Sequence, residues 1–326
     1  MNQKIDLTGR VAVVTGAGGA LGSEYCRALA ARGAAVIVND LGGSTTGEGG
    51  STQYADRVAA EIRAAGGKAV ANYDTVATPA GGEAIIRAAV ENFGRIDIVI
   101  CNAGNQRNAR FGELSEQDID AVYAVHVKGT FFVAQPAYRL MVQQDFGRIV
   151  LVSSQSGIFG NPIRGNYGSA KTAMIGLMNV IAQEAPKSVA VNCVFPNAAG
   201  GRLGGKPGDP RPDADFLAAA GAKARHYMAG MHSSFSASLV TYLSSEWCQT
   251  SQNMYSVLGG KYSRIFAGLT EGWYHAGAVA PTPEEIVAHL TQIGDRTRYA
   301  VPLSGLDEMD TVIALQNKLR QPGMLR

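Results

Sequence analysis

The regular alternation of short apolar runs with helical patterns limits the possible folds more than any other feature of this chain. The apolar runs are rich in β-branched residues and have no polar face, as in parallel strands covered on both sides. Strict alternation of this kind predicts an α/β fold, in which a doubly wound, mostly parallel, Rossmann-type sheet has helices on both faces. The runs lie at residues 11–15, 35–39, 69–73, 96–101, 148–153 and 189–195, and the helical patterns at residues 21–32, 53–65, 82–93, 116–143 and 167–185.

The rest of the chain adds one strand and a long tail. A run near residues 254–257 would be the last strand of a seven-stranded sheet. Residues 200–212 are rich in Gly and Pro and precede a helical pattern at residues 214–229, and the tail contains a helix that begins at Pro283. No linker, internal repeat or low-complexity tract divides the chain, so we expect one domain over residues 1–326.

The composition argues against several classes of protein. The 29 basic and 27 acidic residues are mixed along the chain, so neither nucleic acid nor a membrane surface is an expected partner. No apolar stretch reaches the ~20 residues that span a bilayer. The chain begins without an apolar signal segment and ends without a peroxisomal Ser-Lys-Leu. Its four cysteines lack metal-ligand spacing, so we expect no metal and a cytoplasmic location.

A glycine-rich turn joins the first strand to the first helix. Small residues there let the backbone approach a pyrophosphate, which the N-terminus of the following helix favours electrostatically. The second strand ends at Asp40, where a carboxylate can accept hydrogen bonds from the adenosine ribose and repel a 2′-phosphate. This predicts NAD rather than NADP, unless Asp40 is only a turn residue. The candidate cofactor-binding residues of the turn are Gly16, Gly18, Leu21 and Gly22.

Two further positions follow from the same layout. The fourth strand ends in Asn102, Ala103 and Gly104, at the carboxyl edge where ligands bind in open α/β sheets. We expect this segment to lie against the cofactor, although Asn102 could merely cap a turn. His126 lies in the long helix before the fifth strand and is a candidate member of a proton relay. The competing interpretation is a packed or exposed histidine without a chemical role.

Tyr167 and Lys171 form the candidate acid/base pair. On a helix they are i and i+4 neighbours and project from one face. An adjacent ammonium is expected to lower the phenol pKa, ordinarily about 10, toward the range in which it exchanges protons at neutral pH. Ser154 follows a strand and its hydroxyl could hold a carbonyl oxygen. The pair alone occurs by chance on many helices, and the preceding nucleotide-binding pattern gives it weight.

These motifs resemble the short-chain dehydrogenase/reductase superfamily over roughly residues 7–257. The resemblance rests on the glycine-rich turn, on the Asn102 segment, and on Ser154 with Tyr167 and Lys171. It implies that the Tyr is the general acid/base and that the Lys binds the nicotinamide ribose while lowering the Tyr pKa. The Ser would polarise the substrate oxygen. Cofactor-binding roles are thereby implied for Tyr167 and Lys171 as well.

A closer resemblance is to the (3R)-hydroxyacyl-CoA dehydrogenase domains of the peroxisomal multifunctional enzyme type 2 group, which includes 17β-hydroxysteroid dehydrogenase type 4. It rests on residues 39–43, 66–74, 156–161 and 196–198. It implies that Thr75 and Val76 lie near the adenine, and that Pro196 and Asn197 lie near the nicotinamide carboxamide. The expected reaction is NAD-dependent interconversion of a 3-hydroxyacyl-CoA and a 3-ketoacyl-CoA, by a homo-oligomer (a dimer or a tetramer).

Three features depart from the superfamily pattern. Ala20 replaces the middle glycine of the turn, and His126 stands where most members have a relay Asn. Residues 200–232, expected to form a substrate lid, and the C-terminal extension at residues 264–326 do not follow the group closely. The substrate could therefore instead be a free hydroxysteroid or another hydrophobic secondary alcohol. The same motifs are also compatible with a non-catalytic dinucleotide-binding protein, or with a hydratase or epimerase on the same fold.

Overall fold

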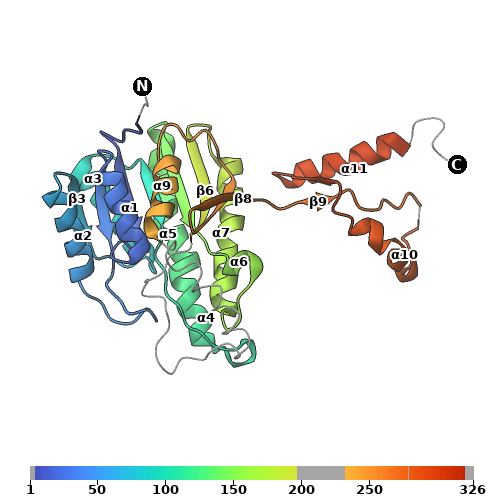
Figure 1. Ribbon diagram of the computed structural model, residues 1–326, viewed down its shortest axis with the longest axis horizontal. Helices are drawn as coiled ribbons and strands as arrows, with labels where there is room; N and C mark the ends of the chain where they lie inside the picture. Colours follow the sequence, from blue (N-terminus) through green and yellow to red (C-terminus); the bar gives the residue numbers. More distant parts are fainter. Residues whose placement is uncertain (1–3, 197–231, 278, 320–326) are drawn as a thin grey trace. The chain divides into compact units, whose positions relative to one another are not determined.

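The computed structural model describes residues 4–196, 232–277 and 279–319 (Figure 1). The chain divides into two compact units, Met1–Arg264 and Ile265–Arg326. The sequence predicted one domain with an extension beginning near residue 264, so the division falls where that extension was expected to start.

The first unit is built on one sheet, with the strand order β3-β2-β1-β4-β5-β6-β7-β8. The pairs from β3 to β7 are all parallel, which confirms the predicted fold class. The strands are β1 (Val11–Thr15), β2 (Ala35–Asn39), β3 (Lys68–Asn72), β4 (Ile98–Cys101), β5 (Gly147–Val152), β6 (Val189–Pro196), β7 (Asn253–Leu258) and β8 (Lys261–Ile265).

The predicted number of seven strands is wrong, because β8 adds an eighth. Gly259 and Gly260 separate β7 from β8 and have φ values of 55° and 82°. Two successive residues with positive φ form the tight turn that matches the twist of a hairpin. The Gly-Gly pair between two short runs was a usable hairpin signal in the sequence.

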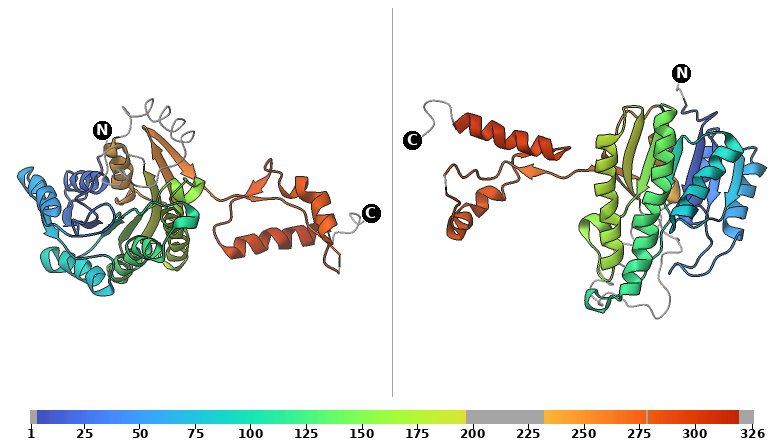
Figure 2. Two further views of the ribbon diagram at one scale, coloured as in Figure 1. Left: turned by 90° about the horizontal axis from the view of Figure 1, so that it is seen from below. Right: turned by 180° about the vertical axis from the view of Figure 1, so that it is seen from behind.

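Helices cover both faces of this sheet (Figure 2). On one face α1 packs against α2 and α9, and on the other α3 packs against α5. The core of the first face contains Tyr25 and Leu29 of α1 and Val240 of α9, packed on alternate strand residues. Among the described residues of the first unit, the α-helices are α1 (Ala20–Ala30), α2 (Gln53–Ala64), α3 (Pro79–Phe93), α4 (Glu116–Tyr123), α5 (Gly129–Gln143), α6 (Ser156–Phe159), α7 (Gly165–Glu184) and α9 (Ser233–Leu243).

The single helix predicted over residues 116–143 is in fact interrupted. A π-helical turn, η2 (Ala124–Lys128), separates α4 from α5 and contains His126. Periodicity does not reveal one extra residue in a turn, because the apolar face continues on both sides of it. Such turns are frequent at functional sites.

The second unit contains the antiparallel pair of β9 (Leu269–Thr270) and β10 (Tyr299–Ala300), with α10 (Pro283–Ile293) and α11 (Gly305–Leu319). The helix predicted to begin at Pro283 is confirmed. Thr282 caps it, because its hydroxyl accepts from the Glu285 amide while the Glu285 carboxylate accepts from the Thr282 amide.

Some predictions fall on residues 197–231, which lie outside the described part of the chain. These are Asn197, the helical pattern at residues 214–229, and the lid segment 200–232 apart from His232. Within the described ranges, no helix is both long and apolar enough to cross a bilayer. The same ranges contain no group of three or more His, Cys, Asp or Glu side chains that could hold a metal ion.

Candidate active site

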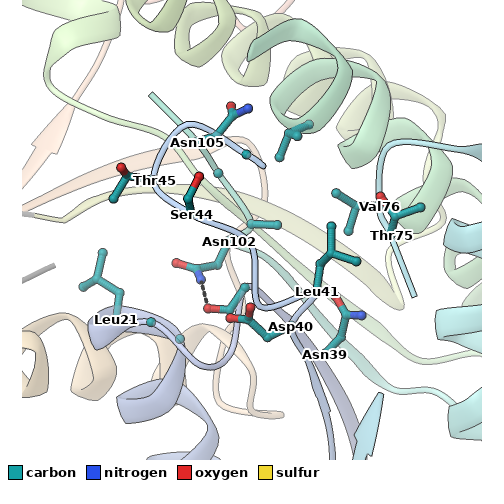
Figure 3. Close-up of a pocket in the computed structure, with 18 of the residues that line it drawn as sticks. Leu21, Asn39, Asp40, Leu41, Ser44, Thr45, Thr75, Val76, Asn102 and Asn105 are labelled. Atoms are coloured by element: carbon teal, nitrogen blue, oxygen red, sulfur yellow. Dashed lines mark hydrogen bonds between the residues drawn. The ribbon is translucent and has the colours of Figure 1, made fainter. Parts of the chain in front are cut away.

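A pocket lies at the carboxyl edge of the sheet, where β1 is flanked by β2 and β4 (Figure 3). Strand order reverses at this point, which is where open α/β sheets bind their ligands. The glycine-rich turn forms its floor and leads into α1, whose N-cap is Gly19. Of the predicted cofactor residues, the pocket is lined by Gly16, Leu21, Gly22, Asp40, Thr75, Val76, Asn102, Ala103 and Gly104.

Asn102 fixes the glycine-rich turn to the end of β4. Its side-chain amide donates to the Thr15 carbonyl at 2.9 Å. The same amide donates to the Gly16 carbonyl at 3.2 Å (Figure 3). In return, the Thr15 hydroxyl accepts from the backbone amides of Asn102 and Ala103, both at 3.0 Å. The Asn102 side chain therefore joins the glycine-rich turn to the end of β4, and both Asn102 and Ala103 line the pocket.

Gly22 lets α1 approach the turn closely. A Cβ atom at this position would lie 2.4 Å from the Gly16 carbonyl oxygen and 2.8 Å from the Ala17 Cα. Both atoms belong to the backbone, so a side chain at residue 22 would displace the helix or the turn. The Ala20 methyl group is accommodated at the first position of α1, where it lines the pocket.

We expect Gly22→Ala to weaken NADH binding at least tenfold and to lower the free energy of unfolding by about 1–3 kcal/mol, the usual effect of overpacking. Fluorescence titration with NADH and chemical denaturation measure the two quantities. Gly176→Ala is the matched control, because Gly176 lies in α7 with open space around its Cα. The control should keep its NADH affinity. Equal NADH affinity of both variants would contradict the close approach at Gly22.

Asp40 is a buried carboxylate at the end of β2, with 4% of its surface exposed. One of its oxygens accepts from the Gly18 amide at 2.8 Å and the other from the Gly42 amide at 2.7 Å. Gly18 does not itself line the pocket but orients this carboxylate. The two bonds fix a negative charge in the pocket wall, where ribose hydroxyls can donate to it and a phosphate would be repelled.

Ser154, Tyr167 and Lys171 lie outside this lining, near the carboxyl end of β5. Ser154 comes two residues after β5, and its hydroxyl accepts from the Ser156 amide at 3.2 Å. The Lys171 ammonium donates to the Val152 carbonyl at 2.6 Å and lies 5.8 Å from the centroid of the Tyr167 ring. The Ser153 hydroxyl donates to the Lys171 carbonyl at 2.8 Å, which fixes α7 to the strand.

Burial sets the direction of the pKa shifts of both Tyr167 and Lys171. It raises the pKa of Tyr167, which a hydrogen bond to Ser154 and the charge of Arg164 lower. Burial also lowers the pKa of Lys171 to about 8. The sequence predicted a lowered phenol pKa, and in the structure the shift has the opposite sign. The reason is that desolvation of the phenolate outweighs the neighbouring charges, while the ammonium is bound to a backbone carbonyl.

His126 links the acid/base pair to the pocket. Its ring contacts the Tyr167 ring edge to face at 5.3 Å between centroids, and its Nε2 lies 2.8 Å from the Asn105 carbonyl oxygen. Burial lowers the pKa of His126 to about 3, so the ring stays neutral at neutral pH. The geometry favours a positioning role for this side chain, and its role in a proton relay stays a prediction.

The structure also reveals lining residues that the sequence did not indicate. Leu41, Ser44, Thr45 and Gly47 follow β2, and Asn105 follows the Asn102 segment. No local pattern marks the first group, because a glycine-rich loop after a strand is compatible with many paths. Pro196 is half-buried at the end of β6, outside this lining.

Comparisons with known proteins give one family. A family profile described as short chain dehydrogenase matches residues 10–203. The chain is 37% identical over 309 residues to peroxisomal multifunctional enzyme A of Dictyostelium discoideum, covering 94% of the chain and 65% of that protein. It is 41% identical over 257 residues to a putative short-chain type dehydrogenase/reductase of Mycobacterium tuberculosis, covering 78% and 84% respectively.

A comparison with solved structures also finds a peroxisomal multifunctional enzyme. Full-length peroxisomal multifunctional enzyme type 2 of Drosophila melanogaster superposes with a TM-score of 0.76 at 30% identity, covering 98% of the chain and 52% of that protein. The chain therefore spans less than two thirds of the length of either multifunctional enzyme.

Proposed function

The chain belongs to the short-chain dehydrogenase family and is an oxidoreductase, and we propose that it interconverts a secondary alcohol and a ketone with NAD. One observation carries the proposal. A pocket with a fixed carboxylate at Asp40 lies at the same carboxyl edge of the sheet as Ser154 and the buried pair of Tyr167 and Lys171. NAD rather than NADP is proposed because the Asp40 charge would repel a 2′-phosphate.

The pocket fits a dinucleotide. The glycine-rich turn and the N-terminus of α1 line the pocket where a pyrophosphate would bind. Gly22 lets α1 pack directly against this turn, since a Cβ there would meet the Gly16 carbonyl oxygen. Asp40 would hold the adenosine ribose, Thr75 and Val76 would flank the adenine, and Lys171 would bind the second ribose. When bound, NAD accepts the hydride of the alcohol carbon.

The acid/base chemistry belongs to this chain's own side chains. The Ser154 hydroxyl would hold the substrate oxygen, and the Tyr167 phenolate would accept the alcohol proton at its oxygen. The Lys171 ammonium, 5.8 Å from the ring centroid, would stabilise the phenolate before it takes this proton. The surrounding burial excludes water from the proton's path, since Tyr167 and Lys171 are only 7% and 5% exposed.

For the substrate we propose a 3-hydroxyacyl-CoA thioester. The segments at residues 39–43, 66–74 and 156–161, which resemble hydroxyacyl-CoA dehydrogenases, support this, as does similarity over nearly the whole chain to peroxisomal multifunctional enzymes. The second candidate is a free hydroxysteroid or another hydrophobic alcohol. The oligomeric state and the cytoplasmic location stay predictions from the sequence.

The absorbance of NADH at 340 nm tests the proposal. The purified chain is given NAD with 3-hydroxyacyl-CoA thioesters of several chain lengths, and with free hydroxysteroids and secondary alcohols. We expect turnover of the thioesters. Turnover of free alcohols alone would refute the hydroxyacyl-CoA assignment, and no NADH from any substrate would refute the dehydrogenase activity.

Asp40 is expected to set the choice of cofactor. Replacing Asp40 with Ser and Leu41 with Arg removes the repelling charge and offers a cation to a 2′-phosphate. A charged hydrogen bond contributes about 1.5–3 kcal/mol, so the ratio of kcat/KM for NADP to that for NAD should rise at least tenfold. Asp120→Ser, which removes the same charge from the exposed face of α4, should leave the ratio unchanged. A wild-type preference for NADP would refute the assignment.

A further inference from the structure

Residues 41–50, called the strap below, lie between β2 and α2 in the chain and contact the segment that follows β4. The strap begins directly after Asp40, and its residues Ser44 and Thr45 line the pocket (Figure 3). Gly47 lines the pocket as well. The Gln106 amide donates to the Thr45 carbonyl at 2.8 Å. Because β2 and β4 lie on opposite sides of β1, this contact carries the strap across the crevice in which a dinucleotide would lie.

Arg107 holds the far end of the strap. Its Nε donates to the Thr46 carbonyl at 3.1 Å, and its guanidinium forms an ion pair with Glu48 at 3.4 Å. Gly47 lies directly against Asn105, since a Cβ on Gly47 would be 2.7 Å from the Asn105 side-chain nitrogen. Three consecutive strap residues are therefore held by three consecutive residues after β4.

The strap has little apolar surface to bury. Five of its ten residues are glycine, and its one large apolar side chain, Leu41, is 42% exposed. Several of its other bonds are internal or at its base, as from the Ser44 amide to the Glu48 carbonyl at 2.7 Å and from the Ser51 amide to the Leu41 carbonyl at 3.0 Å. A segment with few buried apolar contacts opens at low free-energy cost, and here it would open as a unit.

The segment after β4 that contacts the strap is itself held in place. The Arg107 carbonyl accepts from the Asn166 side-chain amide at 2.9 Å, and the same amide donates to the Asp118 carbonyl at 3.1 Å. Asn166 immediately precedes Tyr167, and its side-chain oxygen accepts from the Tyr167 backbone amide at 2.7 Å. Arg107 is thus attached through its backbone to the helix that carries the proposed acid/base, so opening would displace the strap and leave Arg107 in place.

We propose that the strap is a gate for cofactor exchange and that Arg107 is the positioning residue that holds it closed. The proposal rests on the proposed function, in that the pocket binds a nicotinamide dinucleotide. The dinucleotide enters and leaves when the contacts of Thr45 and Thr46 with Gln106 and Arg107 separate. Cofactor release is then limited by the opening of the strap.

A reversible crosslink tests the gate directly. A Cβ on Gly47 would lie 3.6 Å from the Asn105 Cβ, within the ~3.5–4.5 Å that a disulfide requires. The double variant Gly47→Cys, Asn105→Cys is loaded with NADH, oxidised, and mixed with excess NAD in a stopped-flow fluorimeter. We expect NADH release at least tenfold slower than from the same protein after reduction. The native cysteines Cys26, Cys101, Cys193 and Cys248 are all buried and should not interfere.

The two single-cysteine variants are the controls, and oxidant should leave their release rates unchanged. Because the oxidised and reduced forms share one sequence, the strain of a side chain at Gly47, whose φ is 88°, cancels in the comparison. Equal release rates in the two forms would overturn the gate. Persistent free thiols in a thiol titration after oxidation would also overturn it, since the strap would then not lie against Asn105.

The variant Arg107→Ala tests separately whether Arg107 holds the strap closed. We expect its NADH release rate to rise at least fivefold, whereas Arg110→Ala, which removes an exposed guanidinium three residues along, should release NADH like the wild type. A lower melting temperature with an unchanged release rate would show a merely structural role and refute the assignment. Failure of the wild-type chain to bind NADH at all would instead contradict the proposed function, so the two failures are distinguishable.

Discussion

Tyr167→Phe is expected to lower kcat by a factor of about 10²–10⁴, the usual contribution of a general acid/base group. The variant keeps the aromatic ring, which packs against His126 and Val122, and removes only the hydroxyl that is proposed to exchange the proton. NADH affinity should therefore stay within about twofold of the wild type. Steady-state rates at 340 nm and fluorescence titration with NADH measure the two effects.

Tyr25→Phe is the matched control for this variant. Tyr25 is fully buried in the opposite face of the sheet, and its hydroxyl hydrogen-bonds to the Ser236 hydroxyl at 3.3 Å. Loss of the Tyr25 hydroxyl should lower the free energy of unfolding by about 1 kcal/mol and leave kcat unchanged. If Tyr167→Phe retained more than a tenth of the wild-type kcat, Tyr167 would not be the proton acceptor.

Lys171→Met is expected to reduce both kcat and cofactor affinity. The methionine keeps most of the apolar volume of a side chain that is 5% exposed, and it removes the ammonium. A hydrogen bond from a charged group contributes about 1.5–3 kcal/mol, so the NADH dissociation constant should rise roughly tenfold to a hundredfold. A parallel fall in kcat follows because the phenolate loses the neighbouring positive charge. An unchanged dissociation constant would contradict the ribose contact.

The same side chain gives the pH dependence of NADH affinity in the wild type. Burial lowers the pKa of Lys171 to about 8, and its ordinary value is 10.5. The ammonium is therefore present below about pH 8 and is progressively lost above it. If the charged form binds the ribose as proposed, NADH affinity should be highest below pH 8 and fall as pH rises through that value. Lys171→Met should show no such fall, and an equal fall in both proteins would assign the pH dependence to another group.

The strands and most helices were predictable because their signals are local. The predicted bounds of β1 and β2 coincide with those in the structure, since an apolar β-branched run between turn residues has few alternatives. Pro283 likewise marked the start of α10, and the structure adds the Thr282 cap that precedes it. Where a strand was missed, as with β8, the Gly259-Gly260 signal was present in the sequence.

Burial and long-range contacts were not predictable in this way. The phenol pKa of Tyr167 depends on how completely the fold excludes water from the ring, and that exclusion reverses the sign expected from Lys171 alone. The interruption of the 116–143 helix by η2 was likewise not predicted, although His126 within it was chosen as a candidate residue.

The sequence by itself determined the alternation of strands and helices along most of the first unit, the glycine-rich turn proposed to bind a phosphate, and the residue types of the proposed acid/base group. These features follow from the periodicity of apolar residues, from the positions of glycines and from spacings of a few residues. All of these signals are local in the sequence. Only the tertiary structure decided that residues 41–50 cross the pocket and that Arg107 holds them, because that contact joins positions 61 residues apart. It also decided which charges are desolvated, since burial is a property of the whole packed chain and not of any one segment.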